Sequence, residues 1–180
     1  LRGTFTDEIR FTSSDVTKPD SLDGLQLTAI DTNNQPVINT AVADTTAVTV
    51  ASINHVTIDH LTITGGVKGI VVSGSSATYV SDVNIHDNDI SGIASTVMST
   101  ISAIELSYAK ASVIHDNTIH DVAVTISDAS STYLYGIYVS SGQDIALRRN
   151  TVSTFGMNST LTVASSHFSY VYTFYLNNVS

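Results

Sequence analysis

The sequence predicts an all-β solenoid, in which short parallel strands wind around one axis and stack about 4.8 Å apart. The first observation is an internal repeat, because large apolar residues recur at intervals of 27, 29, 33 and 27 residues. The second is that segments rich in β-branched residues alternate with Gly, Asn, Asp and Ser. Dividing the chain by its repeat predicts about five to six rungs. The repeated apolar anchors are Ile58, Ile85, Ile114, Leu147 and Phe174.

The opening of the chain is expected to contain three short strands, at residues 8–12, 25–27 and 36–38. Turn residues separate them, among them Pro19, Gly24 and Asn33. Each later circuit is expected to contain three strands of alternating polar and apolar residues. In order, these are residues 48–50, 56–58 and 62–64; 70–72, 83–85 and 89–91; 104–106, 112–114 and 118–120; 137–139, 145–147 and 151–153; and finally 161–163 with 172–174.

An asparagine follows four of the five apolar anchors at a distance of three residues, and Leu61 takes this place after the first anchor. Asparagine tolerates the left-handed backbone conformation that a tight turn requires. Side-chain amides that stack on successive rungs can also hydrogen-bond to one another. We therefore predict a structural ladder of Asn88, Asn117, Asn150 and Asn177 beside an inward column of the anchors.

Composition favours a single domain over residues 1–180, because 42% of the residues are hydrophobic and only 13% are charged. The net charge of −9 argues against nucleic acid and against an anionic membrane surface. The chain contains no run of about 20 apolar residues, so membrane insertion is not predicted. The chain has no cysteine, so it has no disulfide and no thiolate metal site, and no cofactor is predicted.

The abundance of Ser and Thr together with low charge favours an extracellular or cell-surface location. The chain starts at Leu1, which fits a cleaved leader or a piece of a longer solenoid.

Two features carry a resemblance to a known superfamily. The turns follow the pattern I-x-x-N-x-I, and the strands Gly69-Ile70-Val71-Val72 and Gly136-Ile137-Tyr138-Val139 share one form. In these features the chain resembles the right-handed parallel β-helix superfamily, which includes pectate-lyase-like enzymes, periplasmic copper-site assembly proteins and many surface proteins. The opening, from Gly3-Thr4-Phe5 to Pro36-Val37-Ile38-Asn39, is similar to the chondroitinase-B and alginate-lyase group. The resemblance implies a right-handed parallel β-helix over almost the whole chain.

In the enzymes of this superfamily the substrate groove usually lies over the first strand of each circuit. A lyase would be expected to have clustered acidic residues for calcium and a nearby Lys or Arg, and a hydrolase two carboxylates about 5 to 10 Å apart. The outward positions here supply one Glu and, several rungs away, one Arg. We therefore assign no catalytic residue, and a polysaccharide lyase or glycoside hydrolase remains the alternative function. The outward positions of the first strands are Arg10, Thr49, Val71, Glu105, Tyr138 and Thr162.

Tyrosines are expected to be concentrated on the loops that border the same face. Aromatic rings with a polar tip suit contacts with sugars, and a carboxylate can accept hydrogen bonds from sugar hydroxyls. The other interpretation is that the rings shield the edges of the coil from water. The candidate carbohydrate-binding residues are Tyr79, Glu105, Tyr108, Tyr133, Tyr135 and Tyr138.

Histidine and aspartate form two further columns just after the anchors. One interpretation is a metal site or an acid–base pair. The other is a solvated turn ridge in which Asp116 and Arg149 neutralise each other. We favour the ridge and predict no metal. The first column is Asp59, His86, His115 and Arg148, the second is His60, Asp87, Asp116 and Arg149, and His120 and Asp121 are near in sequence.

Two N-glycosylation triplets start at Asn158 and Asn178. The segment at residues 170–176 is aromatic and uncharged, unlike the polar caps that stacked-strand rods need. Such a segment favours self-association through the ends of the rod. Together these features predict an extracellular surface or structural module. It would assemble end to end into a rod or fibre and contact polysaccharide through its groove.

Overall fold

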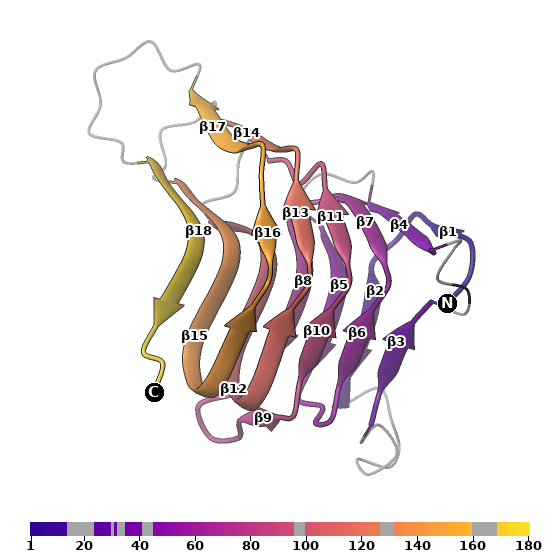
Figure 1. Cartoon of the computed structure of the whole chain (residues 1–180), viewed down its shortest axis with the longest axis vertical. Coiled ribbons are helices and arrows are strands. Elements are labelled where there is room, and N and C mark those ends of the chain that lie inside the picture. The colour runs from indigo at the N-terminus through magenta and orange to yellow at the C-terminus, as the bar shows by residue number, and fades with distance from the viewer. Residues whose placement is uncertain are drawn as a thin grey trace.

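The computed structural model of the chain describes residues 1–13, 24–29, 31, 35–40, 45–95, 100–126, 132–159 and 169–180. These residues form a right-handed coil of parallel strands, in which successive turns lie side by side (Figure 1). The two termini lie toward opposite ends of the row of stacked turns (Figure 1). No helix within these ranges is long and apolar enough to cross a membrane. The predicted right-handed parallel β-helix is therefore confirmed.

Three faces repeat around the coil. The first contains β2 (Ile9–Thr12), β5 (Thr46–Ala51), β8 (Lys68–Ser73), the start of β12 (Thr100–His115), the start of β15 (Thr132–Arg148) and β18 (Ser169–Asn177). The second contains β3 (Gln26–Thr28), β6 (Thr57–Asp59), β10 (Asn84–His86) and the ends of β12 and β15. The third contains β1 (Thr4–Phe5), β4 (Val37–Thr40), β7 (Thr62–Gly65), β11 (Asp89–Ser91), β13 (Thr118–His120) and β16 (Thr151–Val152).

Two of the strand pairs predicted from the sequence are continuous in the structure. The segments at 104–106 and 112–114 belong to β12, and those at 137–139 and 145–147 belong to β15. Each long strand turns the corner between the first and second faces through left-handed residues, with φ of 49° at Tyr108 and 48° at Ala111 in β12. The chain therefore changes direction without leaving the parallel ladder. The short strand β9 (Val80–Ser81) pairs with β12 at this corner.

Four of the predicted anchors form the inward column. Ile58 pairs with Ile85, Ile85 with Ile114, and Ile114 with Leu147, on consecutive turns of the second face. The three isoleucines are fully buried. Burying each such side chain contributes about 1.5–3 kcal/mol, so the column is a main source of stability. Inward residues of the other faces complete a core that extends along the axis.

Phe174 does not belong to this column, contrary to the prediction. It lies in β18 on the first face, pairs with Ile137, and has 44% of its surface exposed. The turn before it is longer than the others, because β17 (Phe155–Ser159) leaves the coil and pairs with β14 (Val122–Ile126) (Figure 1). This excursion shifts the phase of the repeat, so the 27-residue interval ends on a different face. The strand predicted at 161–163 lies outside the described residues.

Two glycines of the first face lie where a side chain would collide with the next turn. A Cβ on Gly69 would lie 2.5 Å from the carbonyl oxygen of Ala103 on the next turn. A Cβ on Gly136 would lie equally close to the carbonyl oxygen of Thr173. Such a distance is below any ordinary contact, so a side chain here would push the turns apart. The glycine that begins both of these strands in the sequence is therefore explained by the close stacking of rungs.

Candidate functional site

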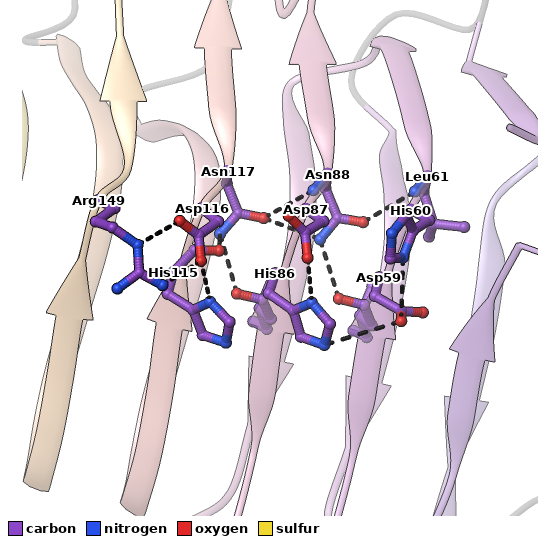
Figure 2. A network of polar contacts seen from close by, with 12 residues as sticks. Asp59, His60, Leu61, His86, Asp87, Asn88, His115, Asp116, Asn117 and Arg149 are labelled. Carbon is purple, nitrogen blue, oxygen red and sulfur yellow. Dashed lines mark hydrogen bonds and ion pairs between the residues drawn. The ribbon is translucent and has the colours of Figure 1, made fainter. Parts of the chain in front are cut away.

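A ladder of side-chain amides lines the corner between the second and third faces (Figure 2). The Nδ2 group of Asn88 donates to Oδ1 of Asn117, and Nδ2 of Asn117 donates to Oδ1 of Asn150, each over 2.9 Å. The same amides bond to main-chain carbonyls of the preceding turns, such as Asn117 Nδ2 to Ile85 at 3.0 Å. Asn88 and Asn117 are 2% and 1% exposed. The ladder therefore satisfies polar groups in the interior and serves the fold.

The left-handed residue of each corner precedes the asparagine, contrary to the prediction that the asparagine itself adopts this conformation. The φ angles are 53° at Asp87, 54° at Asp116 and 50° at Arg149. Asn177 is also outside the ladder, because it pairs with Ser140 on the first face and is exposed. It was misassigned for the same reason as Phe174, namely the longer turn before β18.

At the N-terminal end of the ladder, Leu61 lies where an asparagine would be expected. Its main-chain N–H donates to Oδ1 of Asn88 over 3.1 Å. The apolar side chain of Leu61 is fully buried. The ladder can therefore end at a residue that supplies only a main-chain donor.

The histidine–aspartate ridge runs beside the amide ladder on the outer surface (Figure 2). His86 pairs in register with Asp59 on one side and with His115 on the other, and His115 pairs with Arg148. The imidazole rings of His86 and His115 stack, with centroids 4.8 Å apart and planes 5° from parallel. The Nδ1 atom of each ring bonds to the next residue, Asp87 at 2.8 Å and Asp116 at 2.6 Å.

Asp116 accepts hydrogen bonds from two neighbouring side chains of the ridge. Its two oxygens accept hydrogen bonds from Nε and Nη2 of Arg149, at 2.6 and 2.5 Å. These bonds from Arg149, followed by the bond from His115, hold the pKa of Asp116 well below its usual range. Asp116 therefore remains ionised, so the Nδ1 of His115 is the donor in the bond between them. Nε2 of His115 has no hydrogen-bond partner among the described residues.

His120 bridges two turns of the third face. Its Nδ1 bonds to Asp121 at 2.7 Å and its Nε2 bonds to Asp89 at 2.8 Å. The hydrogen bond to Asp121, and to a lesser degree that to Asp89, raises the pKa of His120 above its ordinary value. Within the described parts of the chain, no group of three or more His, Asp or Glu side chains has an arrangement that could hold a metal ion.

The outward residues of the first face form straight rows along the axis. In one row Glu105 pairs in register with Val71 before it and with Tyr138 after it. Arg10, at the far end of this row, lies three turns from Glu105. Arg10 and Glu105 are therefore not brought together. Tyr175 pairs with Tyr138 and follows it in this row. Thr162, which the sequence predicted for this position, lies outside the described residues.

Glu105 has a cationic partner that the sequence reasoning missed. Nζ of Lys68 lies 2.6 Å from Oε2 of Glu105, and the hydroxyl of Ser102 donates to the same oxygen over 3.2 Å. Lys68 and Ser102 pair in register in the neighbouring row. In the sequence, the place of Lys68 three residues before the outward Val71 could have indicated this partner of Glu105. Oε1 of Glu105 has no hydrogen-bond partner among the described residues.

Six tyrosines continue the two rows and a third row beside them. Ring centroids on neighbouring strands are 5.1 Å apart for Tyr133 and Tyr170, 5.6 Å for Tyr135 and Tyr172, and 5.7 Å for Tyr138 and Tyr175. Tyr135 is at the centre, is 7% exposed, and stacks on Tyr138 at 4.7 Å. Burial, followed by the neighbouring rings, raises the pKa of Tyr135 to about 12.

The other two candidate tyrosines lie apart from this cluster. Tyr79 and Tyr108 meet edge to face near the corner with the second face, with centroids 5.8 Å apart. The backbone of Asn158 lies in β17, opposite Thr125, and its side chain is outside the described part of the structure. Asn178 is exposed and left-handed, with φ of 54°.

Comparison with known proteins gives one match. The family model described as "Right handed beta helix region" matches residues 6–179. No curated protein and no solved structure shows a significant match to the chain. The matched region covers nearly all of the 180 residues, including every strand of the second face.

Proposed function

We propose that this chain, which belongs to the right-handed β-helix family, is an extracellular surface or structural module that contacts polysaccharide through its first face. The observation that supports this is the row of Val71, Glu105 and Tyr138, which continues to Tyr175 with one side chain on each turn. Turns repeat about every 4.8 Å, so the row offers regularly spaced contacts. An extended polymer of repeating units can occupy several of them at once.

The chemistry along this row suits sugar hydroxyls. Oε1 of Glu105 is an unpartnered acceptor, whereas Lys68 fixes the other oxygen of the carboxylate. Tyr138 is half-buried and provides an aromatic ring with a hydroxyl group beside this acceptor. Tyr135 is buried beneath its neighbours, so in this proposal it supports the exposed rings and does not touch the polymer.

Affinity electrophoresis in gels that contain neutral, uronate or sulfated polysaccharide tests the proposal. We expect at least one polymer to retard the protein, and the double variant Glu105→Gln with Tyr138→Ala to lose most of the retardation. The matched control, Asp121→Asn with Thr118→Ala, changes one acid and one uncharged residue on the third face and should behave like the original chain. Retardation by none of the polymers, or equal retardation of the double variant, contradicts the proposal. Release of unsaturated sugar in the same incubations would favour the lyase alternative.

A second proposed property is end-to-end association of the coil. Phe174 and Leu176 of β18 are 44% and 54% exposed, although their rows are fully buried at Ile137 and Val139. At the other end of the coil the same two rows begin with Ile9 and Phe11. A second copy stacked head to tail would therefore place apolar residues against apolar residues in both rows.

Light scattering and electron microscopy of the 180-residue chain test this association. We expect particles longer than one coil, and their loss in the double variant Phe174→Lys with Leu176→Lys. Thr118→Lys, which adds a charge on the side of the coil, is the control and should leave association unchanged. A monomer at all concentrations contradicts the proposal.

The extracellular location also has a direct test. In a host that glycosylates its secreted proteins, intact-mass measurement should show an added glycan at Asn158 or Asn178. Absence of any added mass on the secreted protein would contradict glycosylation, and retention of the protein inside the source cells would contradict the location.

A further inference from the structure

Six of the eight tyrosines of the chain lie together at the C-terminal end of the first face. Three belong to β15 and three to β18, and each tyrosine of one strand is in register with a tyrosine of the other. Because the two strands are parallel neighbours, paired side chains leave the sheet about 4.8 Å apart and their rings lie side by side. The pairs are Tyr133 with Tyr170, Tyr135 with Tyr172, and Tyr138 with Tyr175.

The composition of the chain directs one-electron oxidation to these rings. The chain has no cysteine and no tryptophan, which are the other side chains that readily lose a single electron. A tyrosine that loses an electron also loses its phenolic proton and becomes a phenoxyl radical. The unpaired electron is shared between the oxygen and ring carbons that include the two beside the hydroxyl. Two neighbouring radicals can therefore join through these carbons.

Tyr170 is the tyrosine of this cluster that an oxidant in solution reaches most easily. It is 36% exposed, whereas Tyr135 at the centre is 7% exposed and the other four are half-buried. Beside Tyr170 lies the ring of Tyr133, with centroids 5.1 Å apart and planes 8° from parallel. The ring of Tyr172, on the same strand, is farther away, at 6.2 Å. A radical formed at Tyr170 therefore has its nearer neighbour on the adjacent turn of the coil.

We propose that Tyr133 and Tyr170 are a site of covalent modification, at which hydrogen peroxide and a haem peroxidase join the two rings into dityrosine. Each ring gives up one electron and its phenolic proton, and a carbon–carbon bond forms between ring carbons beside the two hydroxyls. The hydrogen on each joined carbon then moves to the phenolic oxygen, so both hydroxyls are restored. The two electrons and two protons reduce one molecule of peroxide to two molecules of water.

The other tyrosine pairs are less suited to this coupling. Tyr135 is shielded from an oxidant, and burial raises its pKa to about 12, so it stays a neutral phenol, which is harder to oxidise than a phenolate. The rings of Tyr138 and Tyr175 are 5.7 Å apart and are tilted by 36°. Tyr79 and Tyr108, away from the cluster, meet edge to face at 89°. The pair on the exposed border of the cluster is therefore the preferred site.

The cross-link would fasten the last strand of the first face. β18 pairs with β15 and with no other strand among those described, and its Phe174 and Leu176 are exposed. A covalent bond from residue 133 to residue 170 closes a long loop, which lowers the entropy of the unfolded chain and stabilises the folded one. The inference requires neither bound polysaccharide nor association between copies, so it stands apart from the proposed function.

Treatment of the whole chain with a haem peroxidase and limiting hydrogen peroxide tests this inference. After denaturation, trypsin cleaves beyond Lys110, Arg148 and Arg149, so Tyr133 and Tyr170 fall in separate peptides, residues 111–148 and 150–180. We expect mass spectrometry to find these two peptides joined and lighter than their sum by two hydrogens. The protein should remain a monomer on a denaturing gel, show the fluorescence of dityrosine, and unfold at a higher midpoint temperature than before treatment.

Phenylalanine variants locate the bond, because they keep the stacked ring and remove only the hydroxyl that oxidation requires. Tyr170→Phe should lose most of the joined peptide. Tyr172→Phe, on the same strand, and Tyr79→Phe, outside the cluster, are matched controls and should retain it. Absence of dityrosine, an undiminished yield in Tyr170→Phe, coupling only between molecules, or coupling only within single peptides would each overturn the inference.

Discussion

Asn88 and Asn117 lie on consecutive turns of the coil, and the amide group of Asn88 donates to Oδ1 of Asn117 over 2.9 Å in an interior that excludes water. Oδ1 of Asn117 also accepts the main-chain N–H of Asn88 at 3.2 Å. One side chain therefore satisfies two donors of the neighbouring turn, in addition to its own bonds. This arrangement makes each asparagine of the ladder a link between rungs.

Replacing Asn117 with alanine should strongly destabilise the chain. The change leaves the main-chain N–H of Asn88 without its partner in the interior, and it removes the bond that the carbonyl of Ile85 accepts and one of the two bonds that Nδ2 of Asn88 donates. Each unsatisfied group costs about 1–3 kcal/mol, so we expect the free energy of unfolding to fall by at least about 2 kcal/mol. Urea unfolding followed by circular dichroism measures this change. Asn177→Ala, outside the ladder, is the control; equal losses in the two variants would contradict the structural role of the ladder.

Replacing Gly69 with alanine should separate neighbouring turns. The added Cβ would meet the carbonyl oxygen of Ala103 at 2.5 Å, and relief of such overlap costs about 1–3 kcal/mol. Thermal unfolding should show a clear decrease in the midpoint temperature. Gly156→Ala is a matched control, because nothing lies within 4 Å of its added Cβ. A Gly69 variant as stable as the control would show that the rungs are less closely stacked than described.

Tyr135 should ionise later than the other tyrosines when the pH is raised. Its pKa is raised to about 12, first by burial and then by the surrounding rings. The ordinary value is about 10, so its neutral form stabilises the fold fully below pH 10 and this contribution is lost as the pH rises toward 12. Ultraviolet absorbance of tyrosinate should show a late step that disappears in Tyr135→Phe and persists in Tyr79→Phe. A single step near pH 10 for all tyrosines would be the contrary result.

The His120 bridge should make stability depend on pH near neutrality. Because the pKa of His120 is raised in the folded chain, its contribution is complete below the unfolded value of about 6.5 and declines as the pH rises through the folded value. The partners Asp89 and Asp121 are well exposed, so the effect should stay under about 1 kcal/mol. Midpoint temperatures measured across this pH range should converge for the original chain and His120→Gln at alkaline pH. A constant difference between them would argue against the bridge.

The column from Ile58 to Leu147 and the amides of Asn88, Asn117 and Asn150 could be located from sequence because they repeat with the turns of the coil. The same reasoning failed at Phe174 and Asn177, because the excursion of β17 adds residues without adding a turn. The segment that contains Phe174 and Asn177 resembles the earlier repeats in sequence, but it lies on the first face of the coil. The left-handed corner was also placed one residue late.

The grouping of outward side chains depended on tertiary structure to a greater degree than the buried column did. Lys68 and Glu105 are 37 residues apart in sequence, and only the stacking of β8 on β12 brings them together. Asn84, His115 and Arg148 lie near one another on the second face because three turns align in register.

The sequence by itself determined the periodic part of this protein, since a side chain that must point inward on every turn leaves a regular trace along the chain. Tertiary structure decided which outward side chains share a surface, since polar residues facing water obey no such period. Their neighbours depend on the length of each loop, and a loop can change length while the buried column remains intact.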